Sequence, residues 1–80
     1  MSSQMLVESR QFIEAASLKR ARTALGCKDL KSVTIARVKD WVTGPNWYAE
    51  SFDPPLPPIA EKEARHAIVK LTGEYFFADD

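Results

Sequence analysis

The chain has 80 residues, a net charge of zero at pH 7, and 45% hydrophobic against 28% charged residues. These values are ordinary for a globular domain and exclude a chain that is disordered throughout. No apolar run approaches the roughly 18 residues that a bilayer requires, so we expect no membrane span. The length predicts a single domain over residues 1–80 with a small core. One cysteine, and an N-terminus without the apolar core of a signal peptide, predict a cytoplasmic protein.

The first predicted element is a helix over residues 3–25, capped by Ser2 or Ser3 and followed by Gly26. Basic residues gather near its C-terminus, where the helix dipole favours them. Its apolar residues cover too wide an arc for a helix with one face in solvent, so we expect a central helix flanked on two sides. These apolar residues are Met5, Leu6, Val7, Phe12, Ile13, Ala16, Leu18, Ala21, Ala24 and Leu25.

A second helix is predicted over residues 30–42, capped by Asp29 or Ser32 and ended by Gly44-Pro45. The residues of its apolar face recur at helical spacing. They are Leu30, Thr34, Ile35, Val38, Trp41 and Val42.

The remaining sequence predicts a long loop, a third helix and a tail. The loop covers residues 44–58 and combines all five prolines with several aromatic rings. The helix covers residues 59–72, carries a narrow apolar stripe and ends before Gly73. Residues 73–80 are expected to form a short extended tail. Together these elements predict an all-α domain of three helices, with the Pro/aromatic loop between the second and the third.

The zero net charge hides an asymmetry along the chain. Residues 1–43 have a net charge of +4, and residues 44–80 have a net charge of −4. Seven of the basic residues lie between Lys19 and Lys39, with Asp29 as the one acid among them. Such a segment meets either an external anion, such as nucleic acid, or the acidic half of its own chain.

Part of this basic segment resembles the helix-turn-helix family of DNA-binding proteins. Gly26 stands at the turn glycine of that pattern, between the apolar Leu25 and Cys27, and Ile35 is the apolar residue nine positions on. Arg22 and Ser32 depart from the pattern. The resemblance implies a regulator that binds double-stranded DNA, while the alternative is two packed helices with solvated charges. The resemblance places Val33, Arg37 and Asp40 at base edges and Lys28, Lys31 and Lys39 at phosphates.

The aromatic residues support our first hypothesis, a small non-enzymatic regulatory or adaptor protein that binds another protein. A domain of this size cannot bury every ring, and the three consecutive rings of residues 75–77 cannot all face inward. In the alternative, the prolines stiffen the loop and hold its rings over the helix core. A homodimer that pairs opposite charges is compatible with either hypothesis. The expected partner-binding residues are Trp47, Tyr48, Phe52, Tyr75 and Phe76.

The sequence carries no enzyme signature, and we expect no cofactor, metal ion or small-molecule substrate. It has no Gly-rich phosphate loop, no nucleophile elbow and no paired catalytic histidines. His66, the one histidine, is expected on the polar side of the third helix, with too few neighbouring ligands for a metal. Cys27 lacks an activating neighbour and is expected to be a half-buried small hydrophobe.

Overall fold

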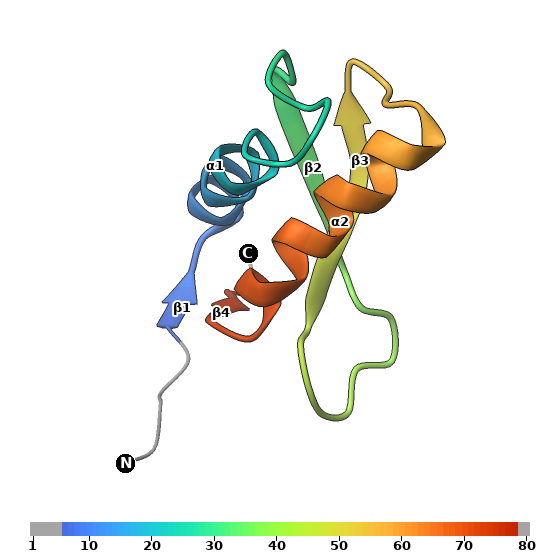
Figure 1. Ribbon diagram of the computed structural model, residues 1–80. Helices are drawn as coiled ribbons and strands as arrows, with labels where there is room; N and C mark the ends of the chain where they lie inside the picture. The colour runs from blue at the N-terminus through green and yellow to red at the C-terminus, as the bar shows by residue number, and fades with distance from the viewer. Residues whose placement is uncertain (1–5, 79–80) are drawn as a thin grey trace.

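The computed structural model describes residues 6–78 and shows an α/β domain, so the expected all-α bundle of three helices is wrong (Figure 1). Within the described residues, two helices and four strands follow one another along the chain, and the strands form two separate two-stranded sheets. In chain order the elements are β1 (Leu6–Glu8), α1 (Arg10–Ala21), β2 (Ser32–Arg37), β3 (Trp47–Asp53), α2 (Pro58–Thr72) and β4 (Tyr75–Phe77).

The expected helix over residues 3–25 is a strand followed by a shorter helix. Ser9 caps α1, because its hydroxyl accepts a hydrogen bond from the Phe12 amide at 3.2 Å. The expected caps Ser2 and Ser3 lie outside the described residues. Leu6 and Val7 precede the cap and pair with the C-terminal strand, so they are not the first turns of a helix.

The expected helix over residues 30–42 is the strand β2 and part of a hairpin loop. Three consecutive β-branched residues, Val33, Thr34 and Ile35, favour an extended backbone because their side chains crowd the turn of a helix. The burial alternates as a half-buried strand requires, with Val33 and Ile35 buried and Thr34 exposed. The two-residue period therefore prevails over the helical spacing that the same residues also satisfy.

The expected loop over residues 44–58 contains the strand β3, which pairs antiparallel with β2. The register moves from Thr34–Ser51 to Ile35–Ala49, so Glu50 is an extra residue that forms a bulge in β3. This bulge allows residues 49 and 52, which are three apart, both to be buried.

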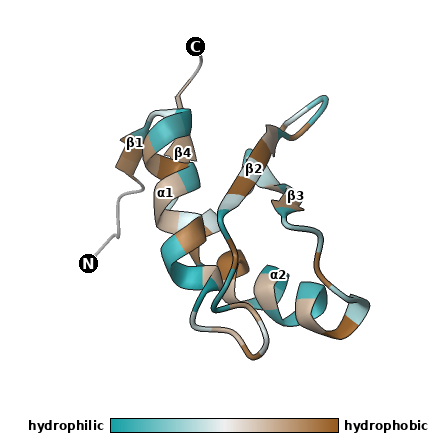
Figure 2. Ribbon diagram, turned by 90° about the horizontal axis from the view of Figure 1, so that it is seen from above, coloured by the Kyte–Doolittle hydropathy of each residue, from teal (hydrophilic) through white to brown (hydrophobic). Residues whose placement is uncertain are grey.

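The expected helix over residues 59–72 agrees with α2. In the expected tail over residues 73–80, Tyr75–Phe77 form the strand β4, and residues 79–80 lie outside the described chain. β4 pairs in parallel with β1, and Val7 lies opposite Phe76. The first and last described strands are therefore neighbours (Figure 1). In Figure 2, β1, β4 and much of β2 have the colour of hydrophobic residues. Neither helix in this part of the chain has the length and apolar character needed to cross a membrane.

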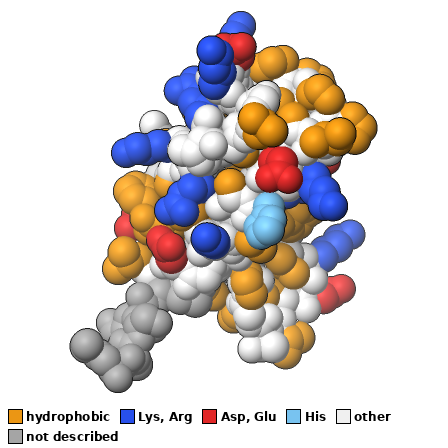
Figure 3. Space-filling view, viewed as in Figure 1, with side chains coloured by type: hydrophobic (Ala, Val, Ile, Leu, Met, Phe, Trp, Pro, Cys, Tyr) orange, Lys and Arg blue, Asp and Glu red, His pale blue; other side chains and the backbone are white. Residues whose placement is uncertain are grey.

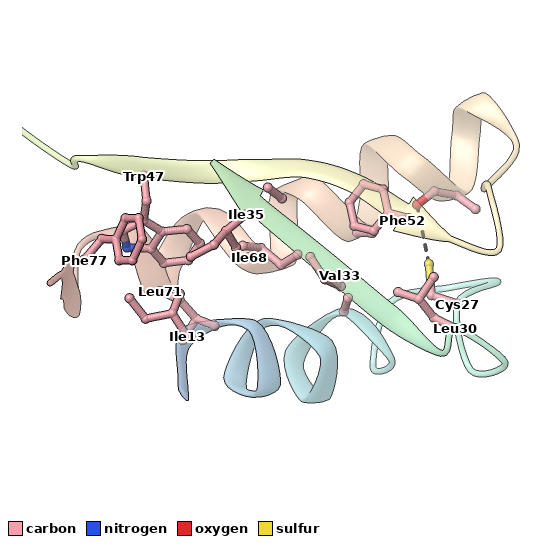
Figure 4. Packing of buried hydrophobic residues seen from close by; sticks show 14 residues of the cluster. Ile13, Cys27, Leu30, Val33, Ile35, Trp47, Phe52, Ile68, Leu71 and Phe77 are labelled. Carbon is pink, nitrogen blue, oxygen red and sulfur yellow. Dashed lines mark hydrogen bonds between the residues drawn. The ribbon is translucent and has the colours of Figure 1, made fainter. Parts of the chain in front are cut away.

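The core lies between one face of the β2–β3 hairpin and the two helices (Figure 4). α1 packs on β2, and α2 packs on β3. The largest buried side chain is that of Trp47, which contributes about 3 kcal/mol or more through burial of its indole. The hairpin contributes Val33, Ile35, Trp47, Ala49 and Phe52 to this core, and the helices contribute Ile13, Ala21, Ala60, Ala64, Ile68 and Leu71.

Candidate protein-binding groove

One face of α1 points away from the hairpin and forms the wall of a surface groove. The core face of the helix carries Ile13, Ser17 and Ala21, all of them buried. A second stripe recurs at intervals of three and four residues and therefore lies on one side of the same helix, continuing into the turn that follows it at Thr23. This stripe consists of Phe12, Ala15, Ala16, Lys19, Arg20 and Thr23.

The opposite wall of the groove comes from α2 and β4. A hollow of about 530 Å³ lies between the α1 stripe and Leu71, Glu74 and Tyr75. A second hollow of about 280 Å³ lies between the end of α1 and the middle of α2, where His66 and Lys70 line it. Both hollows include Arg20 and Thr23, so they are two parts of one groove, which we call the α1–α2 groove.

An aromatic pair closes the larger hollow at one end. The rings of Phe12 and Tyr75 meet edge to face, with their centroids 5.3 Å apart. Phe12 keeps 44% of its surface exposed, and Tyr75 is half-buried. The strand β4 holds Tyr75 in place, because the Trp47 indole donates a hydrogen bond to the Tyr75 carbonyl at 2.9 Å. The groove therefore ends at a fixed, partly exposed aromatic surface.

Three cations line the groove. Lys19 and Arg20 come from α1, and Lys70 faces them from α2. Basic side chains lie beside the pale blue His66 in Figure 3. Two carboxylates also line the groove: Glu63 belongs to the smaller hollow only, and Glu74 to the larger hollow only. Arg20 belongs to both hollows, so positive charge occupies the middle of the groove.

The five expected partner-binding residues lie in four different environments. Trp47 and Phe52 are buried in the core, with exposures of 1% and 9%, so they are structural residues. Tyr48 is exposed on the outer face of the hairpin, away from the groove. Tyr75 lines the groove, whereas Phe76 packs against Trp41 on the other side of β4, at 5.2 Å between ring centroids.

The hollow beside Trp41 and Phe76 is smaller than either part of the groove. It has a volume of about 210 Å³ and is completed by Arg37 and Asn46. Trp41 keeps 42% of its surface exposed, and its indole donates a hydrogen bond to the Gly44 carbonyl within the hairpin loop. This surface lacks the row of convergent cations found in the groove.

The residues expected to read DNA do not form a recognition helix. Val33 is 3% exposed and belongs to the core, so it cannot reach a base edge. Arg37 ends β2, and Lys39 and Asp40 lie in the hairpin loop. Lys28 and Lys31 are exposed in the connection between α1 and β2. The helix-turn-helix geometry is therefore wrong for this segment.

The lone cysteine is a core residue, and the lone histidine is a surface residue. Cys27 is fully buried, and its thiol donates to the Ala60 carbonyl at 3.5 Å (Figure 4). Burial, and secondly the Glu63 carboxylate, raises the pKa of this thiol. His66 is exposed at the rim of the groove. No group of three potential metal ligands occurs among residues 6–78.

The sequence did not predict the groove, although the apolar width of the first helix was one of two signals for it, beside the positive charge of the segment 19–39. The apolar arc of the first helix is too wide for one covered face, and the structure leaves Phe12 and Ala16 of that arc in the groove.

The chain matches no protein-family model, no curated protein and no solved structure. The function therefore has to be inferred from the groove itself.

Proposed function

We propose that this protein is a non-enzymatic regulatory or adaptor module that binds a segment of another protein in the α1–α2 groove. The observation that carries the proposal is the hollow of about 530 Å³ beside the edge-to-face pair of Phe12 and Tyr75. Binding pockets are typically concave and largely apolar, with a few polar groups that fix orientation. This hollow has an apolar lining of Phe12, Ala15, Ala16 and Leu71, bordered by charged side chains.

The folded chain leaves apolar surface of the groove exposed to water, and a partner that covers this surface gains binding energy. Phe12 is 44% exposed, which corresponds to roughly 90 Å² of a phenylalanine side chain. Covering that area by a partner contributes about 2 kcal/mol. Neighbouring Leu6, which pairs with Tyr75 and is 57% exposed, adds to the surface available at this end. An aromatic residue in a hollow is a typical anchor of a protein interface.

The test uses photo-crosslinking, because it reports on the surface without removing a side chain from the core. A photoreactive phenylalanine analogue replaces Phe12 in one variant and Tyr48 in a matched variant. The two positions have similar exposure, 44% and 46%, but Tyr48 lies outside the groove. Each variant is irradiated in cells of the source organism, and adducts with other proteins are identified by mass spectrometry.

We expect a defined protein adduct at position 12 and none of comparable yield at position 48. Ala15 is an exposed residue of the same stripe, and Ala15→Gln narrows the groove with a side chain that is still a good helix former. This second substitution should abolish the adduct at position 12. Adducts at position 48 alone, or adducts at position 12 that survive Ala15→Gln, would contradict the proposal.

A further inference from the structure

We propose that the protein segment bound in the α1–α2 groove is acidic and places its carboxylates next to one apolar anchor residue. This inference rests on the proposed function and adds the chemistry of the partner. The cations Lys19, Arg20 and Lys70 bind the carboxylates, while the apolar hollow beside Phe12 takes the anchor.

Most cations of the basic segment 19–39 have no carboxylate partner within residues 6–78. Between residues 6 and 78, the ion pairs are Arg10–Glu14 and Arg65–Glu61, and Arg37 has an interaction of its own. The other six basic residues of the segment 19–39 form no ion pair with a carboxylate in that part of the chain. Their charge is therefore available to an external anion. These six are Lys19, Arg20, Arg22, Lys28, Lys31 and Lys39.

Part of this charge lies in the groove. Lys19 and Arg20 project into the groove from α1, and Lys70 lines the same hollow as Arg20 from the facing helix. Arg20 is half-buried, whereas Lys19 and Lys70 are exposed, so it is the most sheltered of the three cations. A guanidinium can hold a carboxylate through two hydrogen bonds, which fixes the register of a bound segment. The middle of the groove thus matches an acidic residue in the partner.

The lining of the groove suits an acidic protein segment better than a nucleic acid. A nucleic acid presents a continuous row of phosphates, which would meet Glu63 in one hollow and Glu74 in the other. The larger hollow also carries apolar surface from Phe12, Ala16 and Leu71 beside its cations, and a row of phosphates would leave that surface uncovered. A peptide can place its carboxylates only where the cations are, and an aliphatic or aromatic side chain in the hollow. The groove therefore favours a peptide.

The test is an unbiased selection of short random peptides displayed on phage against the immobilised full-length protein. Enriched peptides are synthesised, and their affinities are measured by fluorescence anisotropy for three variants. The groove-neutral variant carries Lys19→Gln, Arg20→Gln and Lys70→Gln. The matched control carries Lys28→Gln, Lys31→Gln and Lys39→Gln, which removes the same charge outside the groove. The third variant is Phe12→Ala.

We expect the enriched peptides to carry net negative charge and one large apolar residue. Three partly exposed charge pairs together correspond to about tenfold in affinity, so the groove-neutral variant should bind about tenfold more weakly and the control variant about as well as the wild type. The effect of neutralisation should nearly vanish at about 1 M salt, where the screening length is about 3 Å.

The outcomes separate the inference from the proposed function. If the selected peptides are neutral or basic and bind Phe12→Ala more weakly than the wild type, the inference of an acidic partner is wrong. The groove would remain the binding site. Peptides that bind all variants equally, or a library that yields no enrichment, would overturn both. A labelled DNA duplex that displaces the selected peptides, and whose binding depends on the three groove cations, would also overturn the acidic protein segment.

Discussion

The side chain of Asn46 pairs with the backbone of Phe77 as a neighbouring β-strand would. Its Nδ2 donates to the Phe77 carbonyl at 3.0 Å, and its Oδ1 accepts from the Phe77 amide at 2.9 Å. The opposite side of β4 is paired with β1. Asn46 is buried, so these two hydrogen bonds satisfy backbone groups that water cannot reach. One amide therefore joins the hairpin to the C-terminal strand and keeps the neighbouring Tyr75 at the end of the groove.

Replacing this amide should destabilise the fold. Asn46→Ala leaves the buried amide and carbonyl of Phe77 without partners, which costs about 2–4 kcal/mol in the free energy of unfolding. Urea denaturation followed by circular dichroism measures the loss. Thr43→Ala, at an exposed position of the same loop, is the control and should change stability by less than about 0.5 kcal/mol. Equal midpoints for the two variants would show that Asn46 does not hold β4.

The two tryptophans should give separable fluorescence signals. Trp47 is 1% exposed and Trp41 is 42% exposed. In Trp41→Phe, only the buried indole emits, and we expect a blue-shifted spectrum that resists acrylamide quenching. In Trp47→Phe, the emission should be red-shifted and quenched readily. A quenchable signal from folded Trp41→Phe would mean that Trp47 is exposed and would return it to the candidate partner-binding residues.

The sequence predicted local features better than the pairing of distant segments. The helix over residues 59–72 was predictable because proline precedes it, Gly73 follows it and its apolar stripe has a single period. Residues 30–42 satisfy both the helical spacing and the two-residue spacing of a strand. The β-branched run Val33-Thr34-Ile35 favours the strand. The parallel pairing of β1 with β4 joins residues at opposite ends of the chain, and no local pattern indicates it.

The candidate site was predictable only in part, because the same residue type serves the core and the surface. Trp47 and Phe52 alternate inward across a bulge whose position the sequence does not reveal, so their burial could not be separated from the exposure of Tyr48. The groove needs α1 and α2 side by side, which is tertiary information. The excess apolar width of the first helix and the positive charge of the segment 19–39 were the two signals available in advance.

Both outer edges of the β2–β3 hairpin are covered by arginine side chains from the helices. Arg10 of α1 donates to the Ile35 carbonyl at 2.6 Å, and the Glu14 carboxylate accepts from the Ile35 amide at 3.0 Å. Arg65 of α2 donates to the carbonyls of Ala49 and Glu50 at the bulge. Each arginine also pairs with a glutamate four residues away on its own helix. These contacts occupy strand edges that could otherwise pair with another chain.

Uncovering these edges should promote self-association. Arg10→Gln and Arg65→Gln combined remove the charged donors, cost about 1–3 kcal/mol in stability, and leave the edges of β2 and β3 open. We expect a shorter lag in thioflavin T fluorescence at elevated protein concentration. Lys28→Gln with Lys62→Gln removes the same charge from exposed positions and is the control. Equal lag times for the two double variants would show that the arginines do not protect the edges.

The buried thiol of Cys27 should make stability depend on alkaline pH. Its pKa is raised in the folded protein by burial and by Glu63, so the folded state keeps the proton that the unfolded chain releases. The resulting stabilisation is complete below the unfolded pKa of about 8.5 and is lost as the pH rises from there toward the folded pKa. The stability of the wild type relative to Cys27→Ala should therefore fall as the pH rises above about 8.5. A constant difference would contradict this prediction. The native thiol should also react with a disulfide reagent far more slowly than the unfolded one.

The hydroxyl of Ser17 is a defect in the core that a single substitution should repair. Ser17 is fully buried on the face of α1 that meets the hairpin, and its Oγ has no hydrogen-bond partner within the described chain. A buried hydroxyl without a partner costs about 1–3 kcal/mol, and alanine has a higher helix propensity than serine. Ser17→Ala should therefore raise the free energy of unfolding by about 1 kcal/mol or more. Gln11→Ala, at an exposed position of the same helix, measures the propensity gain alone and should raise it by only a few tenths of a kcal/mol. A loss of stability in Ser17→Ala would show that the hydroxyl is hydrogen-bonded in solution.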